Sequence, residues 1–188
     1  MKGIDVRHQI LQAGIVALSF TVASSASASC RCTGKPIDSC LPGTWSMNAS
    51  ELSRITDNFM KDQPGRIEWR GGRVVMQLKP GGDYANQLND IEAAMTIENA
   101  GGMGMEVSGG TEGAYCADAG KLCFQEKRNS LKMVMTVAGT NQQMALPISQ
   151  ATNTQAVNID YTCSSSQLSI RVQEPISGLD ASFDLNRQ

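Results

Sequence analysis

Methionine is the residue type whose number and spacing most suggest a chemical role in this sequence. Seven methionines fall on alternate positions of apolar segments, so in β-strands they would all point to the same side of a sheet. They are Met76, Met95, Met103, Met105, Met133, Met135 and Met144. The thioether side chain is flexible and polarizable, and it adapts to irregular partners. These residues are therefore candidates for lining a ligand site.

Three interpretations of the methionines remain open. They could line an adaptable apolar cavity for a small molecule, or they could fill a core that has few aromatic residues. The Met-x-Met pairs at 103–105 and 133–135 also offer thioethers, which suit Cu(I). Inward positions without any histidine argue against copper, and we expect no metal and no cofactor.

Six cysteines follow the N-terminal segment. They are Cys30, Cys32, Cys40, Cys116, Cys123 and Cys163, and an even number in an exported chain indicates up to three disulfides. Cys116 and Cys123 flank the turn signal Asp118-Ala119-Gly120, and a hairpin there would bring the two Cβ atoms within bonding reach. We predict that these two pair, and that the other four tie a lead-in together and tether it to Cys163. Lipidation of Cys30, with attachment to a membrane, is the alternative for that residue.

The sequence offers little for catalysis, and we expect a non-enzymatic protein. Its single histidine, His8, lies in a segment that we expect to be removed, which excludes histidine-based triads and zinc sites from the remainder. Asp90 and Glu92 could act as a carboxylate pair, or bind calcium together with Asp83 and Asn89. Glu92 falls on the outward side of its segment, so we interpret these carboxylates as solvated.

The N-terminal segment has the three parts of a secretory signal peptide. Basic residues precede an apolar stretch from Ile10 to Ala23, and Ala26-Ser27-Ala28 is a suitable cleavage site. We expect residues 1–28 to be removed near Ala28 and the protein to be exported to the periplasm or the extracellular space. The formal net charge is −2, and acidic and basic residues alternate without a basic run. Nucleic acid is therefore not an expected partner.

Residues 29–43 form an irregular, cysteine-rich lead-in, and residues 44–188 form one domain that begins with a helix. Asn48 and Glu51 have capping-box spacing. Leu52, Ile55 and Phe59 share one apolar face, and Pro64-Gly65 ends the helix.

After residue 65 the apolar spacing changes from helical to alternating, which predicts about nine to eleven short strands. Gly71-Gly72 indicates a tight hairpin turn, and Pro80 to Asp83 indicates another. Successive hairpins favour a mainly β fold in which an antiparallel meander closes into a barrel, because closure removes exposed strand edges. A β-sandwich is the alternative. The helix is suited to cover one open end.

Gly43-Thr44-Trp45, the meander of strands and Arg187 near the C-terminus resemble the lipocalin-like, or calycin, β-barrels. Tyr161-Thr162-Cys163 and the Leu-containing segment after it are similar to exported bacterial proteins of this type, which have mostly unassigned functions. The resemblance covers roughly residues 41–187. It implies a barrel in which Trp45 and Arg187 stack at the closed end, with an apolar ligand inside.

Two classes of function remain open. A carrier would bind an apolar, uncharged small molecule in a Met-lined interior, since no Arg or Lys falls on the inward side of the clearest strands. An envelope or extracellular interaction module would have a filled core and would bind another protein through its surface. A continuous cavity among the methionines would favour the carrier.

Overall fold

The computed structural model of the chain describes residues 37–60, 65–97, 101–137, 143–147, 158–174 and 179–188. The predicted signal peptide, Cys30 and Cys32 lie outside these residues, and so do the side chains of Phe59 and Met144. Within the described ranges, no helix combines the length and the apolar character needed to cross a membrane.

Eight antiparallel strands close into a barrel, which confirms the predicted fold class over the sandwich. In order around the ring they are β1 (Gly43–Asn48), β2 (Gly65–Leu78), β3 (Asp83–Ile97), β4 (Gly101–Asp118), β5 (Lys121–Asn129), β8 (Asn158–Cys163), β9 (Gln167–Glu174) and β10 (Leu179–Arg187). Strand β10 pairs with β1 and completes the ring, with Trp45 opposite Arg187. Along the strands, buried side chains alternate with exposed ones, and the buried ones form one core cluster.

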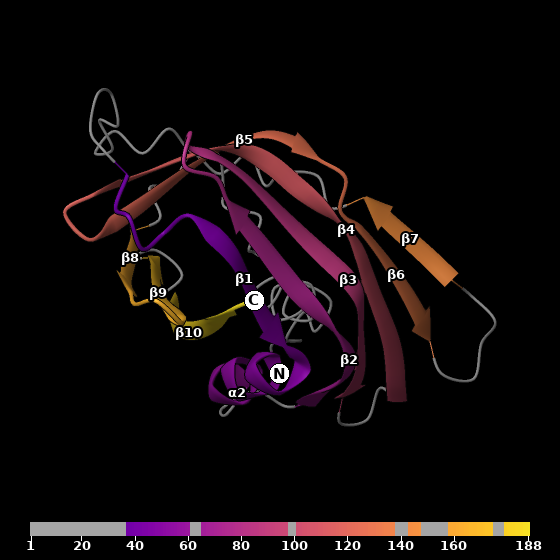
Figure 1. The fold of residues 1–188 in the computed structure, drawn as a ribbon. Helices are drawn as coiled ribbons and strands as arrows, with labels where there is room; N and C mark the ends of the chain where they lie inside the picture. Colours follow the sequence, from indigo (N-terminus) through magenta and orange to yellow (C-terminus); the bar gives the residue numbers. More distant parts are fainter. Residues whose placement is uncertain (1–36, 61–64, 98–100, 138–142, 148–157, 175–178) are drawn as a thin grey trace.

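Two further strands branch from the ring. The first half of β4, from Met103 to Ser108, pairs with β6 (Lys132–Val137), whereas its second half pairs with β5. Strand β7 (Gln143–Pro147) then pairs with β6. Figure 1 shows β6 and β7 extending the β3–β4 wall on the side away from β8, β9 and β10.

The predicted hairpin at Gly71-Gly72 is wrong, because β2 runs through both residues. The register between β2 and β3 shifts on either side of Gly71, so the glycines form a bulge within one long strand. Gly72 has a φ of 87°, and Asp90, on the facing stretch of β3, has a φ of 49°. A bulge bends its strand and increases the local twist. Two segments predicted as separate short strands are therefore one curved strand.

The helix α2 (Ala49–Met60) follows β1 directly and covers one end of the barrel (Figure 1). Asn48 caps it as predicted, since the backbone N–H of Glu51 donates to Asn48 Oδ1 at 3.2 Å. The Glu51 carboxylate accepts from the backbone N–H of Asp184 in β10 at 3.0 Å. On the inner side, Trp69 Nε1 donates to Thr56 Oγ1 at 2.7 Å. These bonds attach the helix to both β2 and β10.

The two glycines of the bulge provide a matched pair for testing its role. In Gly72→Ala the new methyl group would overlap the backbone of Asp90 and Ile91 at a positive φ, whereas a methyl group at Gly71 would meet nothing within 4 Å. We expect Gly72→Ala to lower the free energy of unfolding by about 1–3 kcal/mol. Gly71→Ala should change it by less than about 0.5 kcal/mol. Urea denaturation of both variants measures the difference, and equal losses would contradict the bulge.

Candidate functional site

The end of the barrel opposite α2 is closed by Trp45 and Arg187. Trp45 is fully buried, and its Nε1 donates to the carbonyl of Leu41 at 2.8 Å. The Arg187 guanidinium lies 4.2 Å from the Trp45 ring centre, within the range of a cation–π contact. Arg187 also donates to the carbonyls of Cys40 and Pro42, at 2.6 and 2.9 Å. The stack implied by the lipocalin-like resemblance is thus present in this chain.

Gly43 makes room for this arrangement. A Cβ atom at position 43 would overlap the guanidinium of Arg187. The first residue of Gly43-Thr44-Trp45 therefore leaves space for the cation, and the third supplies the ring beneath it. Trp45 lies in the first strand of the ring, with the helix after it.

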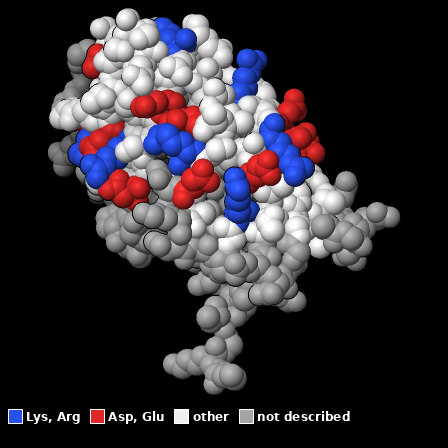
Figure 2. All heavy atoms as spheres, turned by 90° about the horizontal axis from the view of Figure 1, so that it is seen from below, with Lys and Arg blue, Asp and Glu red and all other residues white. Residues whose placement is uncertain are grey.

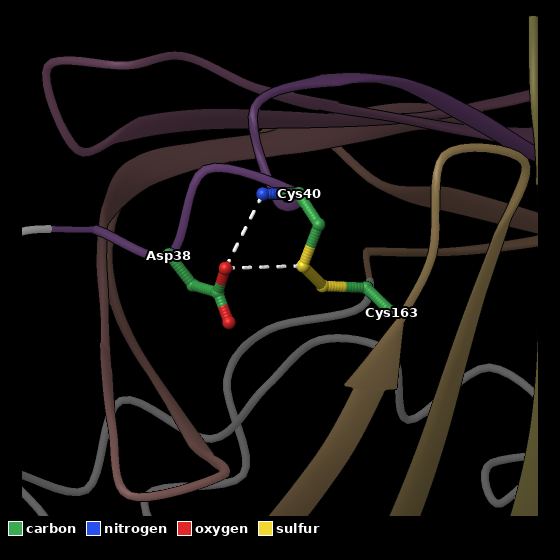
Figure 3. Close-up of side chains that lie close together, drawn as sticks. All are labelled: Asp38, Cys40 and Cys163. Atoms are coloured by element: carbon green, nitrogen blue, oxygen red, sulfur yellow. Dashed lines mark hydrogen bonds between the residues drawn. A yellow bond between two sulfur atoms is a disulfide. The ribbon is translucent and has the colours of Figure 1, made fainter.

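The lead-in is attached covalently to the same end. Cys40 forms a disulfide with Cys163 at the end of β8, which agrees with the predicted tether. Figure 3 shows the Asp38 carboxylate beside this disulfide: the backbone N–H of Cys40 donates to Asp38 Oδ1 at 3.3 Å, and Cys40 Sγ lies 3.2 Å from the same oxygen. Asp38, Cys40 and Cys163 are close enough to share a metal ion. Because both sulfurs are committed to the disulfide, neither is a thiolate that could bind one.

Cys116 and Cys123 lie directly opposite each other in the β4–β5 ladder, and both are disulfide-bonded. The structure describes no bond between these two residues, so the predicted Cys116–Cys123 pair is not confirmed. Since Cys40 is joined to Cys163, neither of these can be the partner of Cys116.

Five of the predicted methionines come together on the inner face of β3, β4 and β6. Met95 stands opposite Met103, and Met105 stands opposite Met135. Met133 lies on the same side of β6 as Met135, two residues away. Met95, Met105 and Met133 are buried, whereas Met103 and Met135 are half-buried. We call these five residues the methionine face.

The remaining two methionines stand in different positions. The backbone of Met144 in β7 lies opposite Met135, which continues the register of the methionine face. Met76 is buried in β2 opposite Trp45, near the other end of the barrel.

A buried polar group also lies on the inner wall, and the sequence analysis missed it. Asn86 of β3, Thr111 of β4 and Glu126 of β5 are buried among apolar residues, with exposed fractions of 3%, 2% and 9%. Asn86 stands opposite Thr111, and its Nδ2 is 3.5 Å from Thr111 Oγ1. The Asn86 Oδ1 atom is buried without a hydrogen-bond partner. Continuing the alternation Leu122, Phe124 by one more step would have identified Glu126 as inward-facing.

Tyr84 connects this group to the aromatic core. Burial, followed by the nearby charge of Glu126, raises the pKa of Tyr84 to about 12. The Tyr84 ring packs edge-on against Phe124, with 5.0 Å between ring centres. It occupies the space that a side chain at Gly113 would need. We call Tyr84, Asn86, Thr111 and Glu126 the polar group.

Charged side chains otherwise lie on the outside. Figure 2 shows acidic and basic residues interspersed on one face of the molecule. Apart from Arg187, every lysine and arginine within the described ranges is exposed. Asp90 and Glu92 are exposed as well, in line with their interpretation as solvated carboxylates.

The sequence matches no model of a known protein family, and no curated protein shows significant similarity to it. The fold and the interior therefore define the class of protein: a closed eight-stranded antiparallel barrel with one covering helix. Membership of a lipocalin-like family stays a prediction.

The contacts of Arg187 lead to a stability prediction. Arg187→Ala removes two charge-assisted hydrogen bonds and the stack on Trp45, and we expect it to lower the free energy of unfolding by about 2–4 kcal/mol. Arg187→Lys should recover part of this loss, because an ammonium keeps the charge but not the planar fork. Guanidinium denaturation followed by tryptophan fluorescence measures both. The control is Arg171→Ala, which removes an exposed pair with Asp180 and should have a much smaller effect. Equal effects of Arg187→Ala and Arg171→Ala would contradict a structural role for Arg187.

The disulfide of the lead-in leads to a second prediction. Cys40 and Cys163 are 123 residues apart, and cross-linking a long loop restricts the unfolded chain strongly. We expect the double variant Cys40→Ser/Cys163→Ser to unfold with about 2–5 kcal/mol less free energy than the wild type. A loss below about 1 kcal/mol would contradict a stabilising role for this bond.

Proposed function

We propose that this chain is an exported, non-enzymatic β-barrel that carries a small apolar molecule in its methionine-lined interior. The observation that carries the proposal is the register of Met95 with Met103 and of Met105 with Met135. It gathers flexible thioether side chains from three strands onto one wall. Such a wall can change shape around different apolar ligands, whereas branched aliphatic side chains would hold one shape.

The position of the methionine face also supports access for a ligand. It lies along the stretch of β4 where β6 and β7 branch from the ring, and Met103 and Met135 are half-buried there. A ligand that enters beside the branch would contact these two residues first. It would then reach the buried Met95, Met105 and Met133.

Export is part of the proposal and rests on the predicted signal peptide. The Cys40–Cys163 disulfide supports it, because structural disulfides form and persist in oxidising compartments.

The second candidate is an envelope or extracellular interaction module with a filled core. The buried core cluster of aliphatic and aromatic residues also contains Met76, Met95, Met105 and Met133, and this favours the second candidate. In that case the methionines pack against each other and other core residues, and binding to a partner protein uses the outer surface.

The test replaces two buried methionines. We expect Met105→Gln/Met133→Gln to weaken binding of the neutral fluorescent probe N-phenyl-1-naphthylamine at least about tenfold, because a ligand in the interior would lose apolar contacts and meet two amides. Titration of purified protein with the probe measures the dissociation constant. The variant should stay folded if these positions line a cavity, whereas an unsatisfied amide in a packed core costs about 1–3 kcal/mol.

The control is Glu106→Gln/Lys132→Gln, which changes exposed residues on the same two strands and should leave probe binding unchanged. A further variant, Met103→Gln/Met135→Gln, changes the half-buried methionines and gives a folded protein to test if the first variant unfolds. A wild-type protein that binds no apolar probe would overturn the carrier proposal in favour of the filled core.

A further inference from the structure

Met105 stands at the centre of the methionine face, with other methionines as its neighbours on the sheet. Across the ladder to β6 it faces Met135, and across the ladder to β3 it faces Ala93. Met103 precedes it by two residues on β4, so both side chains leave the same side of the strand. Met95 stands opposite Met103 and is therefore a diagonal neighbour of Met105. The register thus places four thioether side chains on adjoining positions of three strands.

These positions are close enough for the sulfur atoms to converge. Residues directly opposite in an antiparallel pair, such as Met105 and Met135, have Cβ atoms about 4.5–5.5 Å apart. Met103 is the diagonal neighbour of Met135, and such neighbours are about 7–8 Å apart, still within reach of long side chains. Each methionine sulfur lies beyond Cβ on a flexible, unbranched chain. The small side chain of Ala93, on the other side of Met105, does not fill the space that these chains need.

The exposure of the three methionines suits an ion that arrives from solvent. Met105 is buried, whereas Met103 and Met135 are half-buried, so the centre of the group lies just inside the surface. Thioethers are soft, neutral donors that suit Cu(I), while hard cations prefer oxygen ligands. Cysteine sulfur does not compete within the described part of the chain, since its cysteines are all disulfide-bonded. They are Cys40, Cys116, Cys123 and Cys163.

We propose that Met103, Met105 and Met135 form a binding site for a single Cu(I) ion. This inference goes beyond the proposed carrier function and does not depend on it. It replaces the expectation of no metal, which was drawn from the inward positions of the methionines. Two of these three positions are half-buried, so an ion bound there keeps its positive charge close to water and avoids the cost of full burial.

The first measurement is a titration of the purified full chain with Cu(I) in the absence of oxygen. Ascorbate keeps the copper reduced, because a thiol reductant would compete for the ion and attack the disulfides. The chromophoric chelator bicinchoninate reports how much copper the protein retains. We expect one Cu(I) ion per chain, and X-ray absorption at the copper edge should show sulfur ligands.

Methionine-to-leucine variants remove the sulfur while keeping an apolar side chain of similar volume, a change that cores usually tolerate. We expect Met105→Leu and Met135→Leu each to weaken Cu(I) binding at least about tenfold. The half-buried Met103→Leu should do the same, and it is the informative variant if a more buried substitution prevents folding. The matched control is Met76→Leu, a buried methionine of β2 opposite Trp45, which should bind Cu(I) as the wild type does. Thermal unfolding confirms that each variant is folded.

The outcomes also separate this inference from the proposed function. Because leucine keeps the wall apolar, Met105→Leu should still bind N-phenyl-1-naphthylamine if the wild type does. Transfer of all copper to bicinchoninate, a spectrum without sulfur ligands, or equal affinities of Met105→Leu and the wild type would overturn the copper site. Failure of the wild type to bind the apolar probe would contradict the carrier function alone.

Discussion

Closure of the barrel at the β1–β10 seam is the constraint on which the rest of the structure depends. This seam has two registered residue pairs, Trp45 with Arg187 and Ser46 with Asn186. Side-chain contacts strengthen the short backbone ladder: Arg187 covers the Trp45 ring and binds the lead-in carbonyls, and Glu51 bonds to β10 from the other end. Without closure, the wall that carries Glu126 and the methionines would face solvent, and these residues would lose their burial.

The interior combines an apolar wall with a small set of acceptors. A carboxylate inside a protein is tolerated when its surroundings stabilise the charge. The same low-polarity surroundings strengthen any charge interaction that a ligand makes.

The sequence predicted the strands, the capped helix and the inward methionines well, because each depends on local spacing. Asn48 caps α2 and the alternation from Val74 to Leu78 reproduces the buried side of β2. Prediction failed where two local structures share one signature. A Gly-Gly pair suits a hairpin turn as well as a bulge, and the pairing of Gly71 with Glu92 on β3 decides between them. The sequence could not predict that β4 pairs with β6 along its first half and with β5 along its second half. Both partners use the same edge of β4, and no local spacing decides between them.

The polar group was missed for a different reason. Asn86, Thr111 and Glu126 are polar residues on inward positions, and alternation rules assign such positions to apolar residues. Their burial follows from register across three strands, and no single segment contains that information. Residues that break a local rule inside a well-ordered fold are often functional.

The seam also has a consequence for how the chain folds. Arg187 binds the carbonyl of Pro42, which is 145 residues earlier in the sequence. Contacts between such distant segments form slowly, because the entropy of closing a long loop is lost before the contact stabilises the structure. Until β10 docks, β1 keeps an unpaired edge on which other chains can add a strand. Slow ring closure therefore makes the unfinished barrel the state most prone to aggregation. The Cys40–Cys163 bond holds the lead-in beside β8. It thereby shortens the time that β10 needs to find β1 and close the ring.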